Sequence, residues 1–309
     1  MGATMKVMGI RKTGYDHVLN KFNIVFNTYG LSRGTAAKSE LDNFSAQFAA
    51  TKPDFLYFFK DEQLKRNFLL SLKKISPKTK FVMFYGDQRG CVPTLIQKRA
   101  DILDALLINN EDPNQFKMYN AAGIKNVFTF HHGVPVNEFK DFDIPISNNV
   151  FFGGNNFNHN KFPLGKLRYD LITRVHKLFG LLVYGAGWPF KTEKAVPRHQ
   201  YARVLRRAHI NLGINHYTVP CYYNRRLFEC LGSGKVHVTY YIPGMEKHFK
   251  NHTHLVWFQT IKQGLDAIQN LLKYPEKREA IAAAGKKLVF EQHSFEVRAL
   301  QFKNILERL

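Results

Sequence analysis

The chain has 309 residues, 45% of them hydrophobic, which suits one or two globular domains and excludes a largely disordered protein. Three cysteines, Cys91, Cys221 and Cys230, are odd in number and widely spaced, which excludes a disulfide framework and a Cys-x-x-Cys metal site. No apolar run approaches the roughly 18 residues of a membrane span. We therefore expect a soluble, reduced, cytoplasmic protein.

The formal net charge is +21, from 45 Lys and Arg against 24 Asp and Glu. Residues 1–150 carry 20 basic and 14 acidic side chains, a net of +6, and residues 151–309 carry 25 and 10, a net of +15. A small anion needs only two or three cations, so a nucleotide pocket does not explain this excess. It favours a polyanionic partner, either nucleic acid or an anionic membrane, over a merely soluble basic surface.

The first half alternates between short apolar runs and segments with helical spacing. We expect strands at 23–27, 54–59, 80–85, 105–109 and 127–131, and helices at 39–49, 63–74 and 113–122. The strands are continuously apolar rather than alternating. This pattern is typical of a parallel sheet that helices cover on both faces.

Residues 133–148 break this rhythm with Gly133, Pro135 and Pro145, and we interpret them as a linker. The pattern then restarts, with strands expected at 149–152, 181–184, 210–214, 236–240 and 255–258 and helices at 167–179, 200–208, 224–231, 261–273, 275–291 and 295–309. The sequence thus predicts two doubly wound α/β domains, 1–147 and 148–309, that face each other across a cleft.

The segment around Arg226 and Glu229 carries the most chemistry. Glu229 follows Arg226 by one helical turn, and Gly232 and Gly234 come next. The cation can neutralise phosphate, and the carboxylate can accept hydrogen bonds from ribose hydroxyls. An amphipathic helix with solvated charges explains the same residues, and the segment alone leaves both interpretations open.

Several motifs of the second half occur in a fixed order. They are Phe-Phe-Gly-Gly-Asn-Asn at 151–156, Val-Tyr-Gly-Ala-Gly-Trp at 183–188, Arg-Leu-Phe-Glu at 226–229, and Pro-Glu-Lys-Arg at 275–278 leading to His293 and Arg298. This order resembles the nucleotide-sugar-binding half of GT-B glycosyltransferases, closest to the spore-maturation-type branch related to glycosyltransferase family 4. The first half is similar to that branch through Phe-Tyr-Gly-Asp at 84–87. The resemblance implies two Rossmann-like domains and a C-terminal helix that crosses back.

The resemblance also implies roles for individual residues. Glu229 would hold the donor ribose and Arg226 would lie near the diphosphate. The residues that would approach the donor at the first turn of the second domain, or meet its pyrophosphate, are Gly153, Gly154, Asn155, Lys161 and Arg168. Family 4 has an acidic residue eight positions before the ribose-binding Glu. Cys221 stands there in this chain, which leaves the contacts to the sugar hydroxyls and the anomeric outcome open.

Two positions in the first half are candidates for catalysis. Asp87 directly follows a predicted strand and could act as a general base for the acceptor hydroxyl, or cap the next turn. Arg89 could contact a phosphate, and His132 could bind the transferred sugar or close a loop. No His, Asp or Cys cluster in the sequence has metal-ligand spacing, so we expect a metal-independent reaction with no cofactor beyond the nucleotide sugar.

The resemblance implies a hexosyl- or pentosyltransferase that moves a sugar from a nucleotide-diphosphate donor to a hydroxyl group, and we expect the donor to be a UDP-sugar. A Walker loop is absent, and Gly185-Ala-Gly187 lacks the third glycine of a dinucleotide fingerprint. The charge favours hydroxymethylated pyrimidine in DNA as the acceptor, as in phage enzymes that glycosylate their own genomes. A cell-surface, spore or lipid-linked glycan is the alternative. A non-enzymatic nucleic-acid-binding protein would explain the charge but not the motifs.

Overall fold

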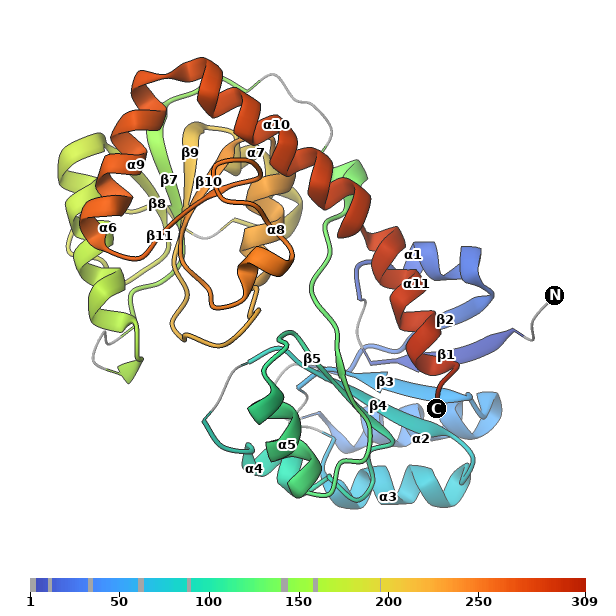
Figure 1. The fold of residues 1–309 in the computed structure, drawn as a ribbon. Coiled ribbons are helices and arrows are strands. Elements are labelled where there is room, and N and C mark those ends of the chain that lie inside the picture. The colour runs from blue at the N-terminus through green and yellow to red at the C-terminus, as the bar shows by residue number, and fades with distance from the viewer. Residues whose placement is uncertain are drawn as a thin grey trace. The chain divides into compact units, whose positions relative to one another are not determined.

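The structure is a computed structural model that describes residues 4–10, 13–32, 36–60, 64–87, 90–139, 144–157, 161–194 and 196–309. The chain forms two compact units (Figure 1). The first comprises Met1–His131 and Phe295–Leu309, and the second comprises His132–Ser294.

The first unit is built on a six-stranded parallel sheet with the order β2-β1-β3-β4-β5-β6. Its strands are β1 (Met5–Gly9), β2 (Ile24–Thr28), β3 (Phe55–Phe58), β4 (Lys80–Tyr85), β5 (Ala105–Ile108) and β6 (Val127–Thr129). Side chains along β4 alternate between two hydrophobic cores, so that Phe81 and Met83 enter one and Val82 and Phe84 the other. The sheet is therefore buried on both faces, as its continuous apolar strands predict.

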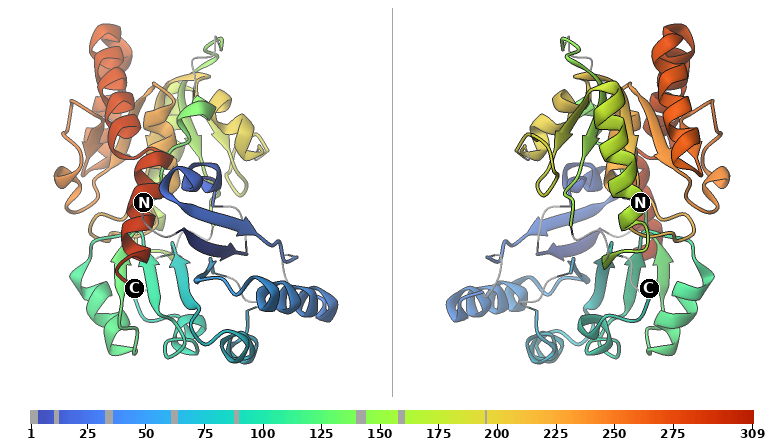
Figure 2. Two further views of the ribbon diagram at one scale, coloured as in Figure 1. Left: turned by 90° about the vertical axis from the view of Figure 1, so that its right-hand side faces the viewer. Right: turned by 90° about the vertical axis from the view of Figure 1, so that its left-hand side faces the viewer.

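Helices pack on both faces of this sheet and complete the two hydrophobic cores of the first unit. They are α1 (Asp16–Leu19), α2 (Lys38–Thr51), α3 (Arg66–Ile75), α4 (Thr94–Gln97), α5 (Pro113–Ala121) and the C-terminal α11 (Phe295–Leu306), with a 3₁₀ turn at Asn20–Phe22. Phe44 of α2 and Leu69 of α3 belong to one core. Phe302 of α11 belongs to the other, where its ring lies 4.9 Å from that of Tyr57, centroid to centroid. Figure 2 shows α11 beside α1 in this unit.

The second unit has a five-stranded parallel sheet with the order β11-β10-β9-β7-β8. Its strands are β7 (Asn148–Gly153), β8 (Leu181–Tyr184), β9 (Ala208–Gly213), β10 (Val236–Tyr240) and β11 (Val256–Phe258). Its helices are α6 (Gly165–Phe179), α7 (Arg198–Leu205), α8 (Arg225–Gly232), α9 (Ile261–Lys273) and α10 (Pro275–Gln292), with 3₁₀ turns at Val136–Phe139 and Met245–Lys247. Val150 and Phe151 again point into different cores.

The predicted fold class is confirmed, since both halves are α/β units with parallel sheets. Helix α11 belongs to the first unit, as the resemblance implies, so the predicted second domain, 148–309, is wrong at its C-terminal end. The predicted boundary between residues 147 and 148 does not coincide with the compact units. Val134 and Phe139, in the predicted linker, are buried in a core of the second unit. The backbone N–H of Val134 also donates to the carbonyl of His293 at 2.9 Å. Burial of these apolar side chains assigns the start of the linker to the second unit.

The short helices α1 and α4 were not predicted, because four residues are too few to show helical periodicity. Helix α7 ends at Leu205, so β9 begins two residues earlier than expected, at Ala208. None of the three cysteines, all of which the structure describes, forms a disulfide, and Cys91 is exposed while the others are buried. Among the described residues, no helix is both long and apolar enough to cross a membrane.

Candidate functional site

A cavity of about 440 Å³ opens at the carboxyl edge of the second unit's sheet. Parallel strands end together at this edge, which is where open α/β sheets bind ligands. The residues around it come from the ends of β7 and β8, from α6, α7 and α8, and from the loop after β9: Gly153, Gly154, Asn155, Phe157, Arg168, Tyr184, Gly185, Val196, Tyr201, His216, Arg225 and Arg226. Five of the seven predicted donor-binding residues are therefore gathered around one cavity.

Hydrogen bonds connect the turn after β7 to the turn after β8. The N–H of Gly154 donates to the carbonyl of Tyr184 at 2.8 Å, and the side-chain Oδ1 of Asn155 accepts from the N–H of Ala186 at 2.9 Å. Gly185 has φ +148°, and a Cβ there would overlap the carbonyl oxygen of Gly154. Only glycine fits at this close approach. The side chain of Asn155 therefore stabilises the contact between the two turns, whether or not it also binds a ligand.

Arg168 is the most buried cation of the cavity, with 2% of its surface exposed. Its guanidinium donates to the carbonyls of Ile214 and Asn155, each at 3.0 Å, and stacks over the ring of Phe152 at 4.8 Å. Burial, and then the neighbouring charge of Arg226, lower the pKa of Arg168 to about 9. Arg168 therefore connects the loop after β7 to the loop after β9, and its guanidinium also lines the cavity.

Helix α8 presents its N-terminus beside the same cavity. Asn224 caps it, since the Asn224 side chain accepts from the backbone N–H of Leu227 at 3.2 Å. Arg226 lies in the first turn and lines the cavity. A helix N-terminus and the guanidinium groups of Arg168 and Arg226 create an environment that favours an anion. A diphosphate has the matching charge.

Glu229 lies one turn deeper in α8, with 1% of its surface exposed. Its Oε1 is 3.0 Å from Nε of Arg225, a cation that the sequence analysis did not single out. The i,i+4 spacing of Arg225 and Glu229 could have indicated the pair. Glu229 itself is not among the residues that line the cavity, so the structure connects its carboxylate to the cavity through Arg225.

Two further cavity residues, Tyr201 and His216, were also missed, because no local pattern marks them. Burial raises the pKa of the Tyr201 phenol, and a Cβ at Gly153 would overlap its hydroxyl. Burial, and then Arg168 and Arg226, lower the pKa of His216 to about 4. His216 is consequently a neutral ring near pH 7, and it packs 4.5 Å from the ring of Phe162.

Cys221, where family 4 has a carboxylate, is fully buried in a core of the second unit. Its Sγ donates to the carbonyl of Gly244 at 3.2 Å, and its backbone has φ +52°. The thiol therefore faces the protein core and does not belong to the residues around the cavity. No side chain at this position provides the sugar contact that the family pattern implies.

The remaining predicted site residues lie elsewhere. Lys161 is exposed and does not line the cavity. Asp87, in the first unit after β4, forms an ion pair with Lys60 at 2.9 Å, with about half of its side chain exposed. His132 is half-buried at the start of the second unit. Arg89 lies outside the described residues.

Comparisons with known proteins agree with this architecture. Sucrose-phosphate synthase from Thermosynechococcus elongatus superimposes with a TM-score of 0.69 over 98% of each chain, at 10% sequence identity. Anabaena HepE in complex with UDP and glucose superimposes with a TM-score of 0.65 over 99% of this chain and 100% of that chain, at 12% identity. The chain has the GT-B fold.

Within this GT-B fold, one matched sequence segment contains all three arginines that line the cavity. Residues 168–304 match a family model described as glycosyl transferase-like. This segment begins at Arg168 and includes all of α8. HepE has also been solved with UDP-glucose, and that structure superimposes with a TM-score of 0.67 at 10% identity over 99% of this chain and 100% of that chain. No curated protein sequence matches the chain.

Proposed function

We propose that the protein is a glycosyltransferase that uses a UDP-sugar. One observation carries the proposal: the glycine turn at 153–154, Arg168 and Arg226 surround a single cavity at the carboxyl edge of the second GT-B sheet. Glu229 lies one turn below, paired with a cation of that cavity. The UDP and UDP-glucose complexes of HepE support the choice of donor class.

The proposed reaction is a group transfer at the anomeric carbon of the sugar. An acceptor hydroxyl forms a new C–O bond, the bond from the anomeric carbon to the diphosphate oxygen breaks, and UDP leaves with that electron pair. Arg226, Arg168 and the α8 N-terminus would stabilise the charge that develops on the diphosphate. Asp87 is proposed to take the proton of the acceptor hydroxyl, and His132 to contact the transferred sugar.

Isothermal titration calorimetry tests the donor assignment with UDP, GDP and CMP. We expect UDP to bind with the lowest Kd, and Arg226→Ala to raise that Kd at least about tenfold, since a charged hydrogen bond is worth roughly 1.5–3 kcal/mol. Lys161→Ala is the matched control, because Lys161 lies outside the cavity. A chain that binds none of the three nucleotides is not a nucleotide-sugar enzyme.

For the acceptor, we propose hydroxymethylated pyrimidine in DNA. The support is the net charge of +21, of which residues 151–309 carry +15. Such an acceptor requires the target base to leave the stack. The proposal includes a metal-independent reaction and a cytoplasmic location, which suits three cysteines that form no disulfide. The alternative acceptor is a spore, cell-wall or lipid-linked glycan, as the resemblance to the spore-maturation-type branch suggests.

The acceptor test compares sugar transfer to hydroxymethylated DNA, unmodified DNA and vesicles that contain anionic lipid and a lipid-linked glycan. If DNA is the acceptor, only hydroxymethylated DNA gains the sugar, whereas both DNAs bind. Affinity should fall roughly a thousandfold between about 50 and 200 mM salt, because each neutralised phosphate releases counterions. Transfer to a lipid-linked glycan, with none to DNA, selects the alternative and leaves the donor assignment intact.

A further inference from the structure

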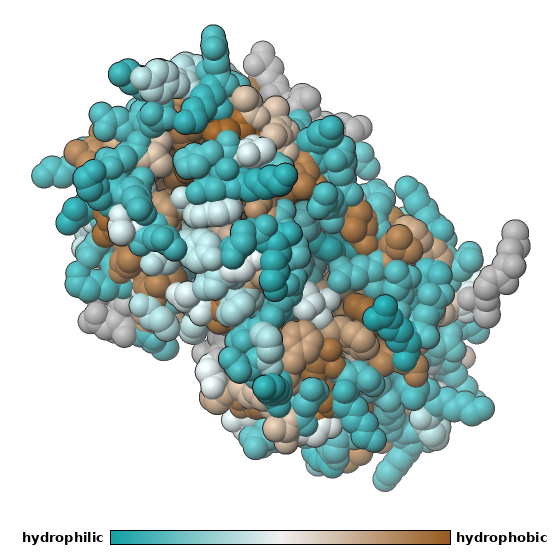
Figure 3. Space-filling view, in the orientation of Figure 1, coloured by the Kyte–Doolittle hydropathy of each residue, from teal (hydrophilic) through white to brown (hydrophobic). Residues whose placement is uncertain are grey.

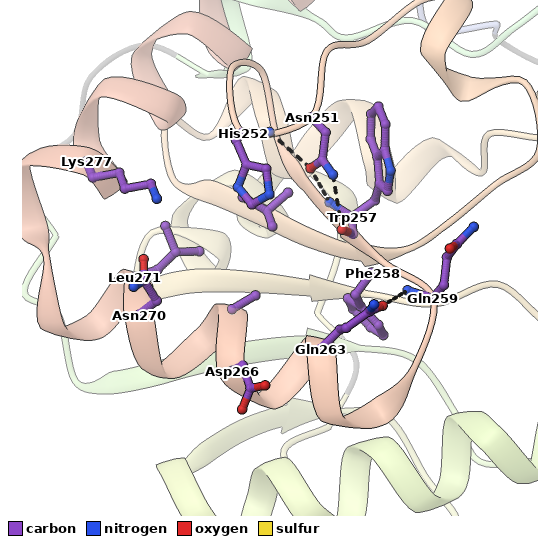
Figure 4. Close-up of a pocket in the computed structure, with 12 residues that line it drawn as sticks. Asn251, His252, Trp257, Phe258, Gln259, Gln263, Asp266, Asn270, Leu271 and Lys277 are labelled. Atoms are coloured by element: carbon purple, nitrogen blue, oxygen red, sulfur yellow. Dashed lines mark hydrogen bonds between the residues drawn. The ribbon is translucent and has the colours of Figure 1, made fainter.

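The second unit has another cavity, of about 570 Å³, that shares no lining residue with the donor cavity. It lies at the edge of the sheet, between β11, the turn that precedes β11, and the helices α9 and α10 (Figure 4). In Figure 4, His252 and Lys277 extend toward the same hollow from opposite sides, and Asp266 and Asn270 follow α9 along its floor. Its volume falls within the range of small-molecule sites.

The lining combines hydrogen-bonding amides with a small apolar surface. Four carboxamide side chains line the cavity: Asn251, Gln259, Gln263 and Asn270. Carboxamides offer both donors and acceptors, as sugar hydroxyls do. Val256, Ala267 and Leu271 supply apolar atoms beside them. Hydrophilic side chains predominate on the surrounding outer surface of α9 and α10 (Figure 3).

The lining has one carboxylate, Asp266, and one ammonium group, Lys277, so it has no net charge that would favour an ionic ligand. Asp266 is an exposed carboxylate that already pairs with Lys262 at 2.8 Å. Lys277 is the cation of the lining, and burial followed by Lys277 lowers the pKa of His252, so that its ring is neutral at pH 7. A divalent cation would need more oxygen charge than one paired carboxylate provides. A phosphate would need more than one cation.

The edge of β11 is closed to a peptide strand. The side chain of Asn251 accepts from the N–H of Trp257 at 2.9 Å and donates to its carbonyl at 3.4 Å. These are the backbone groups that an added strand would require. The Trp257 ring belongs to the core on the opposite face from Phe258, so the cavity contains its backbone rather than its indole.

The backbone at His252 is held in an unfavourable conformation that directs the ring toward the cavity. His252 has φ +58°, the left-handed region that costs a non-glycine residue free energy. Its N–H donates to the carbonyl of Leu255 at 2.8 Å and to Oδ1 of Asn251 at 3.0 Å. Such conformations concentrate at ligand-binding positions.

We propose that this cavity binds a neutral sugar residue, with the hydroxyls on the side chains of Gln259 and Asn270 and on Nε2 of Gln263, and an apolar ring face against Ala267 and Leu271. Oε1 of Gln263 already accepts from the N–H groups of Gln259 and Thr260, so only its Nε2 is offered to the sugar. The side chains of Gln259 and Asn270 make no hydrogen bond within the described part of the chain, so they are available to a ligand. The inference goes beyond the proposed function, since it requires neither donor binding nor transfer. A second sugar site would let the protein hold a glycosylated molecule away from the donor.

The test is a ¹H–¹⁵N NMR titration of the full chain with methyl glucoside, methyl galactoside and methyl N-acetylglucosaminide, and with glucose 6-phosphate as the charged comparison. We expect saturable shifts of the Gln259, Gln263 and Asn270 side-chain amide signals with at least one neutral glycoside, and weaker binding of the phosphate. Asn270→Ala should weaken that binding about tenfold, the value of one or two hydrogen bonds. His252→Gly, which tolerates the backbone conformation, should weaken it as well.

Gln269→Ala is the matched control, because Gln269 is exposed on the same helix and does not line the cavity. The titration is repeated with UDP, whose own shifts at Gly154 and Arg226 report the donor cavity separately. A lack of saturable shifts with every neutral glycoside overturns the proposal, as does binding that both the Asn270 and the His252 variants leave unchanged. Tighter binding of glucose 6-phosphate also overturns it. None of these results depends on whether UDP binds.

Discussion

Nε of Arg225 lies 3.0 Å from Oε1 of Glu229 and joins a half-exposed cation at the donor cavity to a carboxylate that is 2% exposed. The ion pair holds the buried carboxylate in one orientation, and it connects that carboxylate to the cavity through Arg225, which lines it.

Replacing Glu229 with Gln should weaken UDP binding while leaving the fold intact. The amide keeps the buried volume but loses the charge that strengthens hydrogen bonds to ribose hydroxyls. A loss of about 2 kcal/mol, roughly thirtyfold in Kd, is expected by calorimetry. Glu276→Gln, an exposed change in α10, is the control. An unchanged Kd for UDP contradicts the ribose assignment.

Gly185→Ala should destabilise the second unit and disrupt the donor cavity together. The new methyl group would meet the carbonyl oxygen of Gly154, and φ is +148°. We expect a loss of about 2 kcal/mol of unfolding free energy in denaturant titrations, together with weaker UDP binding. Gly30→Ala is the matched control, because a Cβ at Gly30 would meet no atom within 4 Å and the φ of Gly30 is not positive. Equal effects of the two substitutions would show that the close approach is not required.

His237 should make stability depend on pH. It is fully buried in β10, its Nδ1 donates to the carbonyl of Asn211 at 3.0 Å, and burial lowers its pKa to about 4, from 6.5. Because the folded pKa is depressed, the unfolded chain binds the proton first as pH falls below about 6.5, and stability decreases between pH 6.5 and 4. The full effect is about 3 kcal/mol.

Urea titrations between pH 7 and 4.5 measure this dependence. His237→Gln should make the unfolding free energy less dependent on pH, because the titrating ring is absent. His17→Gln, at an exposed position of α1, should leave the dependence as it is. If the His237 variant keeps the wild-type pH dependence, other groups govern it.

Asp87→Asn should lower turnover about a hundredfold with little change in UDP affinity, if Asp87 is the general base. Stability should change by less than about 1 kcal/mol, because its partner Lys60 is also exposed and surface pairs contribute little. Lys60→Met separates the two possible roles, since it breaks the pair and keeps the carboxylate. Equal losses of turnover in both variants would assign the effect to the pair rather than to the base.

The sequence by itself determined the alternation of strands and helices and the parallel character of both sheets. These properties are local, because continuous apolar runs such as 80–85 can be buried on two faces only in a covered parallel sheet. The glycine turn at 153–154 and the spacing of Arg226 and Glu229 were also visible in the sequence, so part of the donor cavity could be predicted. The catalytic roles of Asp87 and His132 stay predictions.

The tertiary structure decided which side chains meet. The order β11-β10-β9-β7-β8 brings the ends of β7, β8 and β9 together, and so places Tyr201 and His216 at the cavity, although neither has a distinctive local pattern. It also buries Arg168 against two carbonyls and leaves Lys161 outside, though both are cations near the same turn. Strand order depends on packing between segments far apart in the chain, and short-range periodicity carries no information about that packing.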